Sequence, residues 1–176
     1  MSLSLGWGDE LQDERPRHGV VFLHVPAQGF LRCVVLSEEP TSYKGHYVAG
    51  AMRLCEGGDC PLCARGVGSQ VRVVVAVWDL GLQASGLLEL SAGAASELRE
   101  LAEGAGALRG LPLSLFREGG HARGRVVVDR MSAAALDGLD WQKIPVPDVR
   151  GHMLGVLRRA ATGSFTFRGG VPGGRA

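Results

Sequence analysis

The sequence has no long hydrophobic run, which argues against a membrane-spanning helix. No stretch approaches the roughly 18 apolar residues that a helix needs to cross a bilayer. The chain has 176 residues, of which 45% are hydrophobic and 21% charged, a composition typical of one globular domain. Its N-terminus is acidic and polar, without the basic flank and the apolar stretch of a signal peptide. We therefore expect a cytoplasmic protein that has no membrane partner.

The chain also lacks the sequence motifs of the common enzyme classes. It contains no Walker loop, no G-x-S-x-G, no H-E-x-x-H and no dinucleotide-binding fingerprint. A zinc deaminase needs an H-x-E motif ahead of P-C-x-x-C, but the order here is C-P-L-C and His46 is followed by Tyr47 and Val48. We therefore expect a binding function and no enzymatic activity.

Cysteine is scarce, yet three of the four cysteines lie in the short stretch C-E-G-G-D-C-P-L-C. Disulfides are disfavoured in the cytoplasm, where thiols stay reduced. A thioredoxin-like pair would begin a helix, whereas Cys60 and Cys63 precede the glycine-rich stretch A-R-G-V-G-S-Q. The C-x4-C-x2-C spacing in a glycine-rich loop suits tetrahedral zinc. We predict zinc bound by Cys55, Cys60 and Cys63, with a loop of free thiols and a redox pair as the alternatives.

A fourth ligand is needed to complete a tetrahedral zinc site. His46 stands nine residues before Cys55, on a segment that could be the strand leading into the loop. Cys33 lies in F-L-R-C-V-V-L-S, an apolar run in which a lone cysteine is usually a small buried hydrophobe. We predict His46 as the fourth ligand, and Cys33, water or another histidine as alternatives. Three cysteines and one histidine leave no open coordination position, so this zinc would be structural.

Most of the remaining chain is predicted to form short β-strands. Residues 70–80 give the strongest signal, because they are rich in valine and contain a tryptophan. Residues 91–106 instead have a helical period, with Ser91 or Ser96 as the cap and Leu98 facing the core. On this helix Glu97 is expected on the outer face. The other expected elements are strands at 18–25, 29–37 and 85–91, a hairpin around 118–121, and a last helix from about Pro147 to Ala160.

This order of elements indicates a small β-barrel. Five or so short strands, with a helix ahead of a late hairpin, are the layout of an OB-fold. An SH3-like barrel, or a zinc ribbon with an appended sheet, would give similar numbers of elements. We expect a mainly β, OB-fold-like small Greek-key barrel with an inserted zinc-binding loop and one or two helices. The domain would span residues 18–162, between a flexible acidic segment, 1–17, and a flexible glycine-rich tail, 163–176.

Lysine is nearly absent, and almost all of the positive charge comes from arginine. The formal net charge is +1, but residues 1–14 hold four acids and no base, so the remaining chain is basic. Arginine pairs with phosphates and stacks on bases, and proteins that bind single strands combine a basic groove with aromatic platforms. Phe116 fits either a core position or such a platform. The expected groove residues are Tyr43, Lys44, Tyr47, Arg53, Arg72 and Arg117.

These segments together resemble a known protein family. His46-Tyr47, Cys55, C-P-L-C, R-V-V-V-A-V-W-D-L and the late L-R-G…F-R-x-G segment look like zinc-containing OB-fold single-stranded-DNA-binding proteins of phage and mobile-element type. The resemblance covers roughly residues 19–131. It implies low-specificity binding of single-stranded DNA, or of RNA, in replication, recombination or mobile-element processes, with proteins of those processes as partners. Many such proteins end in an acidic tail that recruits replication partners, whereas this sequence ends in R-G-G-V-P-G-G-R-A. The alternative is a zinc-stabilised protein-interaction module, an adaptor in a larger assembly.

Overall fold

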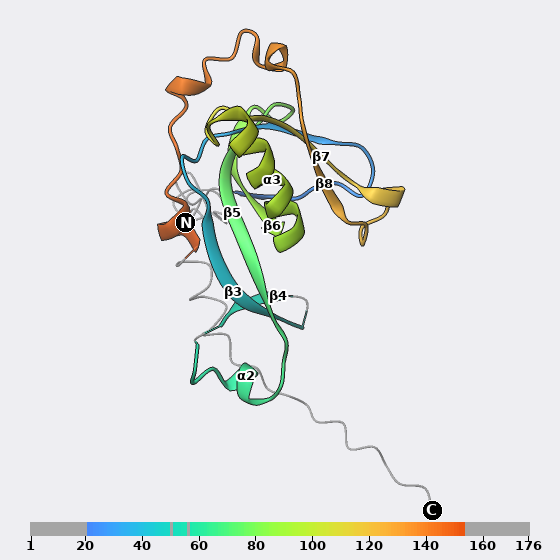
Figure 1. Ribbon diagram of the computed structural model, residues 1–176, viewed down its shortest axis with the longest axis vertical. Coiled ribbons are helices and arrows are strands. Elements are labelled where there is room, and N and C mark those ends of the chain that lie inside the picture. The colour runs from blue at the N-terminus through green and yellow to red at the C-terminus, as the bar shows by residue number, and fades with distance from the viewer. Residues whose placement is uncertain (1–20, 50, 56, 154–176) are drawn as a thin grey trace, which may run out of the picture. The chain divides into compact units, whose positions relative to one another are not determined.

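The computed structural model describes residues 21–49, 51–55 and 57–153 (Figure 1). The expected flexible segments, 1–17 and 163–176, lie outside the described residues. Of the expected last helix, residues 149–153 are described and helical. The chain divides into two compact units, and each is treated by itself below. The first unit is Met1–Tyr43 with Val71–Val149, and the second is Lys44–Gln70 with Arg150–Ala176.

The described part of the chain is mainly β, as predicted, with eight strands in an open mixed sheet. The helices α2 (Pro61–Ala64) and α3 (Ala92–Ala105), three short 3-10 turns and the helical residues 149–153 accompany these strands in the described residues. The strands are β1 (Val21–Leu23), β2 (Leu31–Val35), β3 (Thr41–Val48), β4 (Ala51–Leu54), β5 (Ser69–Asp79), β6 (Ala84–Ser91), β7 (Pro112–Arg117) and β8 (Val126–Arg130). The 3-10 turns are Glu118–Gly120, Ala133–Leu136 and Trp141–Lys143.

The strand order is β1-β6-β5-β2-β7-β8, while β3 pairs with β4 and β5. The predicted hairpins β5–β6 and β7–β8 are both present and antiparallel. The turn between β5 and β6 is held by Asp79, whose Oδ1 accepts hydrogen bonds from the backbone N–H groups of Gly81 (2.7 Å) and Leu82 (3.0 Å). Only aspartate, asparagine and similar short polar side chains close turns in this way. The strand that follows α3, β7, pairs with β2 on the side opposite β5.

The core of the first unit lies between the sheet and α3. Alternate residues of β5 and β6, such as Val75, Val77 and Leu88, pack against Leu98 of α3. The helix begins where predicted, with Ser91 rather than Ser96 as its cap, because the Ser91 hydroxyl accepts a hydrogen bond from the N–H of Ala94. It ends at a left-handed Gly106, the conformation that glycine adopts most easily. No helix of the described chain is long and apolar enough to cross a membrane.

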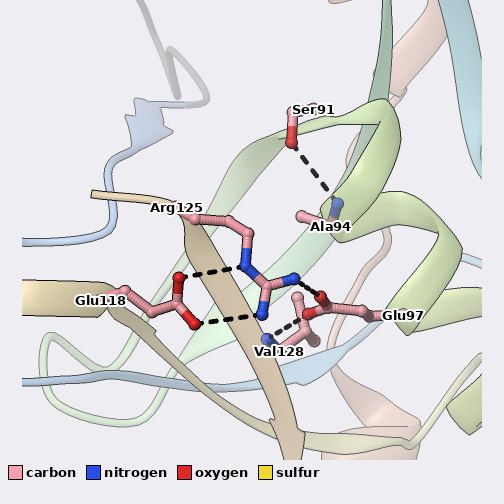
Figure 2. A network of polar contacts seen from close by, with 6 residues as sticks. All are labelled: Ser91, Ala94, Glu97, Glu118, Arg125 and Val128. Atoms are coloured by element: carbon pink, nitrogen blue, oxygen red, sulfur yellow. Dashed lines mark hydrogen bonds and ion pairs between the residues drawn. The ribbon is translucent and has the colours of Figure 1, made fainter. Parts of the chain in front are cut away.

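A polar network joins α3 to β8, the last strand of the sheet order (Figure 2). One carboxylate oxygen of Glu97 accepts a hydrogen bond from the backbone N–H of Val128 (3.0 Å), and the other accepts one from Arg125. Arg125 also forms two hydrogen bonds of 3.2 Å with Glu118 on the other side of the hairpin. The prediction that Glu97 lies on the outer, solvated face of the helix is therefore wrong. Its carboxylate supplies an acceptor for a backbone N–H group of an edge strand.

Candidate metal centre

Four potential metal ligands meet in the second unit. The ligand atoms of His46, Cys55, Cys60 and Cys63 all lie within 4.8 Å of one another. His46 Nε2 lies 3.4 Å from the sulfur of Cys60 and 3.4 Å from that of Cys63, and the sulfurs of Cys55 and Cys63 are 3.5 Å apart. Tetrahedral zinc, with bonds of about 2.0–2.3 Å, places its ligand atoms roughly 3.5–3.8 Å from one another. The structure thus brings together the four residues predicted as ligands, in an arrangement compatible with zinc.

The backbone around the cluster explains how these residues come together. His46 lies opposite Arg53 in the β3–β4 hairpin, and directly after this hairpin the N–H of Cys55 bonds to the carbonyl of Lys44 (2.8 Å). Cys60 caps α2 and Cys63 lies within it, so the two thiols sit three residues apart on one side of a helical turn. Pro61 occupies the first position of that turn, where its missing N–H costs nothing.

The environment of His46 fixes which ring nitrogen can bind a metal. Its Nδ1 lies 3.0 Å from the carbonyl oxygen of Val67 and 3.2 Å from that of Gly68. Carbonyl oxygens only accept hydrogen bonds, so Nδ1 must carry the proton and donate it. Nε2 then keeps a free electron pair, which faces the cysteine sulfurs. Metal-binding histidines are typically held by such a bond to a carbonyl or carboxylate, and nothing in the sequence pattern identified Val67 and Gly68 in this role.

The thiols compete for negative charge when no cation is present. The backbone N–H of Gly57, and then His46, lower the pKa of Cys55. The hydrogen bond with Cys55, together with burial, raises the pKa of Cys63 to about 11. A first thiolate at Cys55 therefore opposes a second one at Cys63. A bound divalent cation removes this opposition, because it deprotonates coordinating thiols outright.

The described residues of the segment 44–70 form almost no apolar interior. Among the described residues of 44–70, only Gly45, His46 and Cys60 are buried. His46 is fully inaccessible and Cys60 is 2% exposed, so the buried side chains among the described residues of this segment belong to the ligand cluster. A segment that buries so little apolar surface is not expected to stay folded without a metal or another cross-link.

Cys33, the alternative fourth ligand, has a different environment. It is completely buried in β2, within the hydrophobic core of the first unit. Burial, and to a smaller extent the charge of Asp79, raises the pKa of its thiol to about 12. The cluster of potential ligands contains His46 and not Cys33. Cys33 is thus a small core residue.

The predicted nucleic-acid-binding residues of the second unit lie on the β3–β4 hairpin. Lys44 and Tyr47 are exposed, and the ring of Tyr47 lies opposite Met52 on the neighbouring strand. Tyr47 is 60% exposed, and Leu54, on the same face of the hairpin, is 37% exposed. Arg53 is half-buried and shares the other face with His46. The hairpin that supplies His46 therefore displays an aromatic ring on one face, and carries Lys44 and Arg53 on the other.

The predicted binding residues of the first unit are engaged with other groups of that unit. The Tyr43 hydroxyl donates a 2.6 Å hydrogen bond to Glu89, and burial, followed by this bond, raises the pKa of Tyr43. The same carboxylate forms an ion pair with Arg72, at 3.8 Å. Arg117 donates hydrogen bonds of 3.0 Å to the backbone carbonyls of Val25 and Gly124. These side chains are thus held by contacts with residues distant in the sequence, which sequence patterns do not reveal.

Comparisons with known proteins give no match: no protein-family model, no curated protein and no solved structure matches the sequence. The features of this chain that bear on its function are the chemistry of the ligand cluster and the residues displayed on the β3–β4 hairpin.

Proposed function

We propose that this protein binds single-stranded nucleic acid, most readily DNA, with little sequence preference. The observation that carries the proposal is the exposed ring of Tyr47 on the hairpin that also supplies the metal ligand His46. Proteins that bind single strands without sequence preference stack bases on aromatic side chains beside basic residues that contact the phosphates. In this proposal Tyr47 is the stacking platform on one face of the hairpin, and Lys44 and Arg53, on its other face, contact the backbone of the strand.

The metal has a structural role in this proposal. His46, Cys55, Cys60 and Cys63 would hold one zinc ion, which would fix the loop relative to the β3–β4 hairpin. All four coordination positions come from the protein, so no position is left for a water or a substrate. The zinc would therefore orient the hairpin that carries Tyr47 and would supply no chemistry.

The sheet topology supports an OB-like architecture for the first unit. The order β7-β2-β5-β6 is that of a Greek key, in which a fourth strand returns to lie beside the first. α3 forms the return connection, and β8 completes the set of five strands. In chain order the five strands of this set are β2, β5, β6, β7 and β8. The zinc-binding segment falls in the connection between the first two of them, β2 and β5. OB-folds use that loop to bind oligonucleotides.

The distribution of arginine supports binding to a phosphate backbone. Residues 150–176 contain five arginines and no acidic residue. This stretch also contains F-T-F-R-G-G-V-P-G-G-R, and segments rich in arginine and glycine are among those that bind single strands. In the first unit, by contrast, Glu89 offsets the charge of Arg72, and Arg117 is assigned a structural role in holding the backbone at Val25 and Gly124.

A protein-interaction module is the second candidate, and one observation favours it. The hairpin face that carries Tyr47 also carries Met52 and Leu54, so a protein partner could cover it as an apolar patch. Such a partner would belong to a larger assembly, for example of replication or recombination. The two functions differ in their salt dependence, because only phosphate contacts release counterions when they form.

Replacing Tyr47 by alanine should weaken binding to a 30-base oligonucleotide by about tenfold, since a stacked aromatic contributes roughly 1–3 kcal/mol per base. The melting temperature and the zinc content should not change, because the ring is 60% exposed. Fluorescence anisotropy with a labelled oligonucleotide measures the effect. Leu54→Ala is the matched control on the same hairpin face, and Tyr47→Phe should retain most of the affinity. Equal losses for Tyr47→Ala and Leu54→Ala would argue against a stacking role.

A further inference from the structure

The first unit displays an aromatic pair outside the predicted groove. Phe30, just ahead of β2, is 58% exposed. Its ring packs edge-on against Phe116 of β7, with ring centroids 5.5 Å apart and planes at 62°. Edge-to-face packing of this kind holds a ring in one orientation. Phe30 is thus an exposed aromatic side chain that is already ordered before any ligand arrives.

The pairing of β2 with β7 places Arg32 on the same face as this aromatic pair. Leu31 lies opposite Leu115 and both point into the core, so the next pair, Arg32 and Ser114, faces the other way. Phe116 follows Ser114 by two residues and therefore shares its face. An exposed arginine and two phenylalanine rings lie together on the face of β2 and β7 that is turned away from the core.

A cleft adjoins these residues. Phe30 and Arg32 line a cavity of about 800 Å³, together with the turn at Leu80–Leu82 and Met131. Binding sites for small molecules typically have volumes of roughly 300–1,000 Å³. Asp79 also lines the cleft, but its Oδ1 accepts the N–H groups of the turn. The cleft is large enough for a nucleotide, with an aromatic wall and a basic side chain.

Arg32, unlike Arg72, which pairs with Glu89, has no ion-pair partner among the described residues. The acid that shares its face, Asp129 on β8, lies opposite Ser114 and is therefore two strands away, at about 10 Å. An arginine with an open guanidinium can pair with a phosphate or stack on a base.

We infer that Phe30, Phe116 and Arg32 form a binding site for an unpaired nucleotide of a single strand. The base stacks on Phe30, which Phe116 holds in place, and Arg32 contacts the adjoining phosphate. This inference rests on the proposed function for the class of ligand. It assigns that ligand to a surface of the first unit that is independent of Tyr47 and of the metal.

Photo-crosslinking of the full chain to a 30-base oligonucleotide containing 5-iodouracil locates the contact. Trypsin cleaves after Arg17, Arg32 and Arg109, among other sites, so Phe30 falls in the peptide 18–32 and Phe116 in the peptide 110–117. Tyr47 falls in a third peptide, 45–53. We expect mass spectrometry to find the nucleotide on 18–32 or 110–117. Crosslinks confined to 45–53 would overturn this site and leave the proposed function intact.

Replacing Phe30 by alanine should weaken oligonucleotide binding about tenfold without lowering the melting temperature. Phe30→Trp should bind at least as well as the native protein, because a larger ring stacks better. Val21→Ala is the control, since Val21 is an exposed apolar residue of the same unit, at 63%. If Phe30→Ala binds as tightly as Val21→Ala, the inference is wrong. If the native chain binds no oligonucleotide, the inference and the proposed function fail together.

Discussion

Replacing Cys60 by serine should release the metal and unfold the zinc-binding segment, Lys44–Gln70. The reason is that Cys60 and His46 are the only buried side chains among the described residues of this segment, so the metal bonds must hold it together. Binding of structural zinc contributes about 10–16 kcal/mol to the folding of zinc-finger peptides at pH 7. The first unit, with its own hydrophobic core, should remain folded. Hydrogen exchange should therefore become fast in 44–70 and stay slow in residues 71–79 of β5 and in β6, β7 and β8.

Cys33→Ala is the matched control for this experiment. Cys33 is also a fully buried cysteine, but it belongs to the core of the first unit. Its replacement should lower the free energy of unfolding slightly and leave one zinc per chain, as measured by elemental analysis. A native protein without zinc, or with disulfides among Cys55, Cys60 and Cys63, would contradict the assignment of the metal centre.

Replacing Glu97 by alanine should lower the free energy of unfolding of the first unit by about 1–3 kcal/mol, the cost of leaving a buried donor without a partner. The change removes the acceptor of the Val128 N–H and one of the two carboxylates that hold Arg125 (Figure 2). Urea denaturation measures the effect. Glu97→Gln keeps an oxygen that can accept the Val128 N–H, and should be milder.

Glu100→Ala provides the comparison for Glu97. Glu100 is exposed on the same helix, so the two substitutions change helical propensity in the same way and remove the same charge. Only Glu97→Ala removes the hydrogen bond between α3 and β8. Equal unfolding free energies for the two variants would show that the network contributes nothing to stability.

Features that depend on residues near one another in sequence could be predicted. The C-x4-C-x2-C spacing and a histidine nine residues upstream identified the four residues that the structure brings together. Valine-rich strands with polar turns between them predicted the β5–β6 and β7–β8 hairpins. The start of α3 followed from its serine cap and its end from glycine, because both act within one helical turn.

Features that depend on distant partners could not be predicted. The carboxylate of Glu89 holds Tyr43 and Arg72 from a neighbouring strand. Arg117 resembles any other surface arginine in the sequence, yet it bonds to the carbonyl of Val25, which is far away along the chain. The parallel pairing of β1 with β6 likewise leaves no local pattern. The contact between Phe30 and Phe116 depends on the register of β2 and β7, which a sequence pattern does not fix.

The most direct test of the central claim is a titration of a labelled 30-base oligonucleotide with the native, zinc-loaded protein at two salt concentrations. We expect binding at 50 mM salt that weakens steeply at 200 mM, because each phosphate contact releases a condensed counterion. Low salt favours electrostatic binding, so the first condition is the most permissive one. Absence of binding at 50 mM salt would contradict the account and would favour the protein-interaction module.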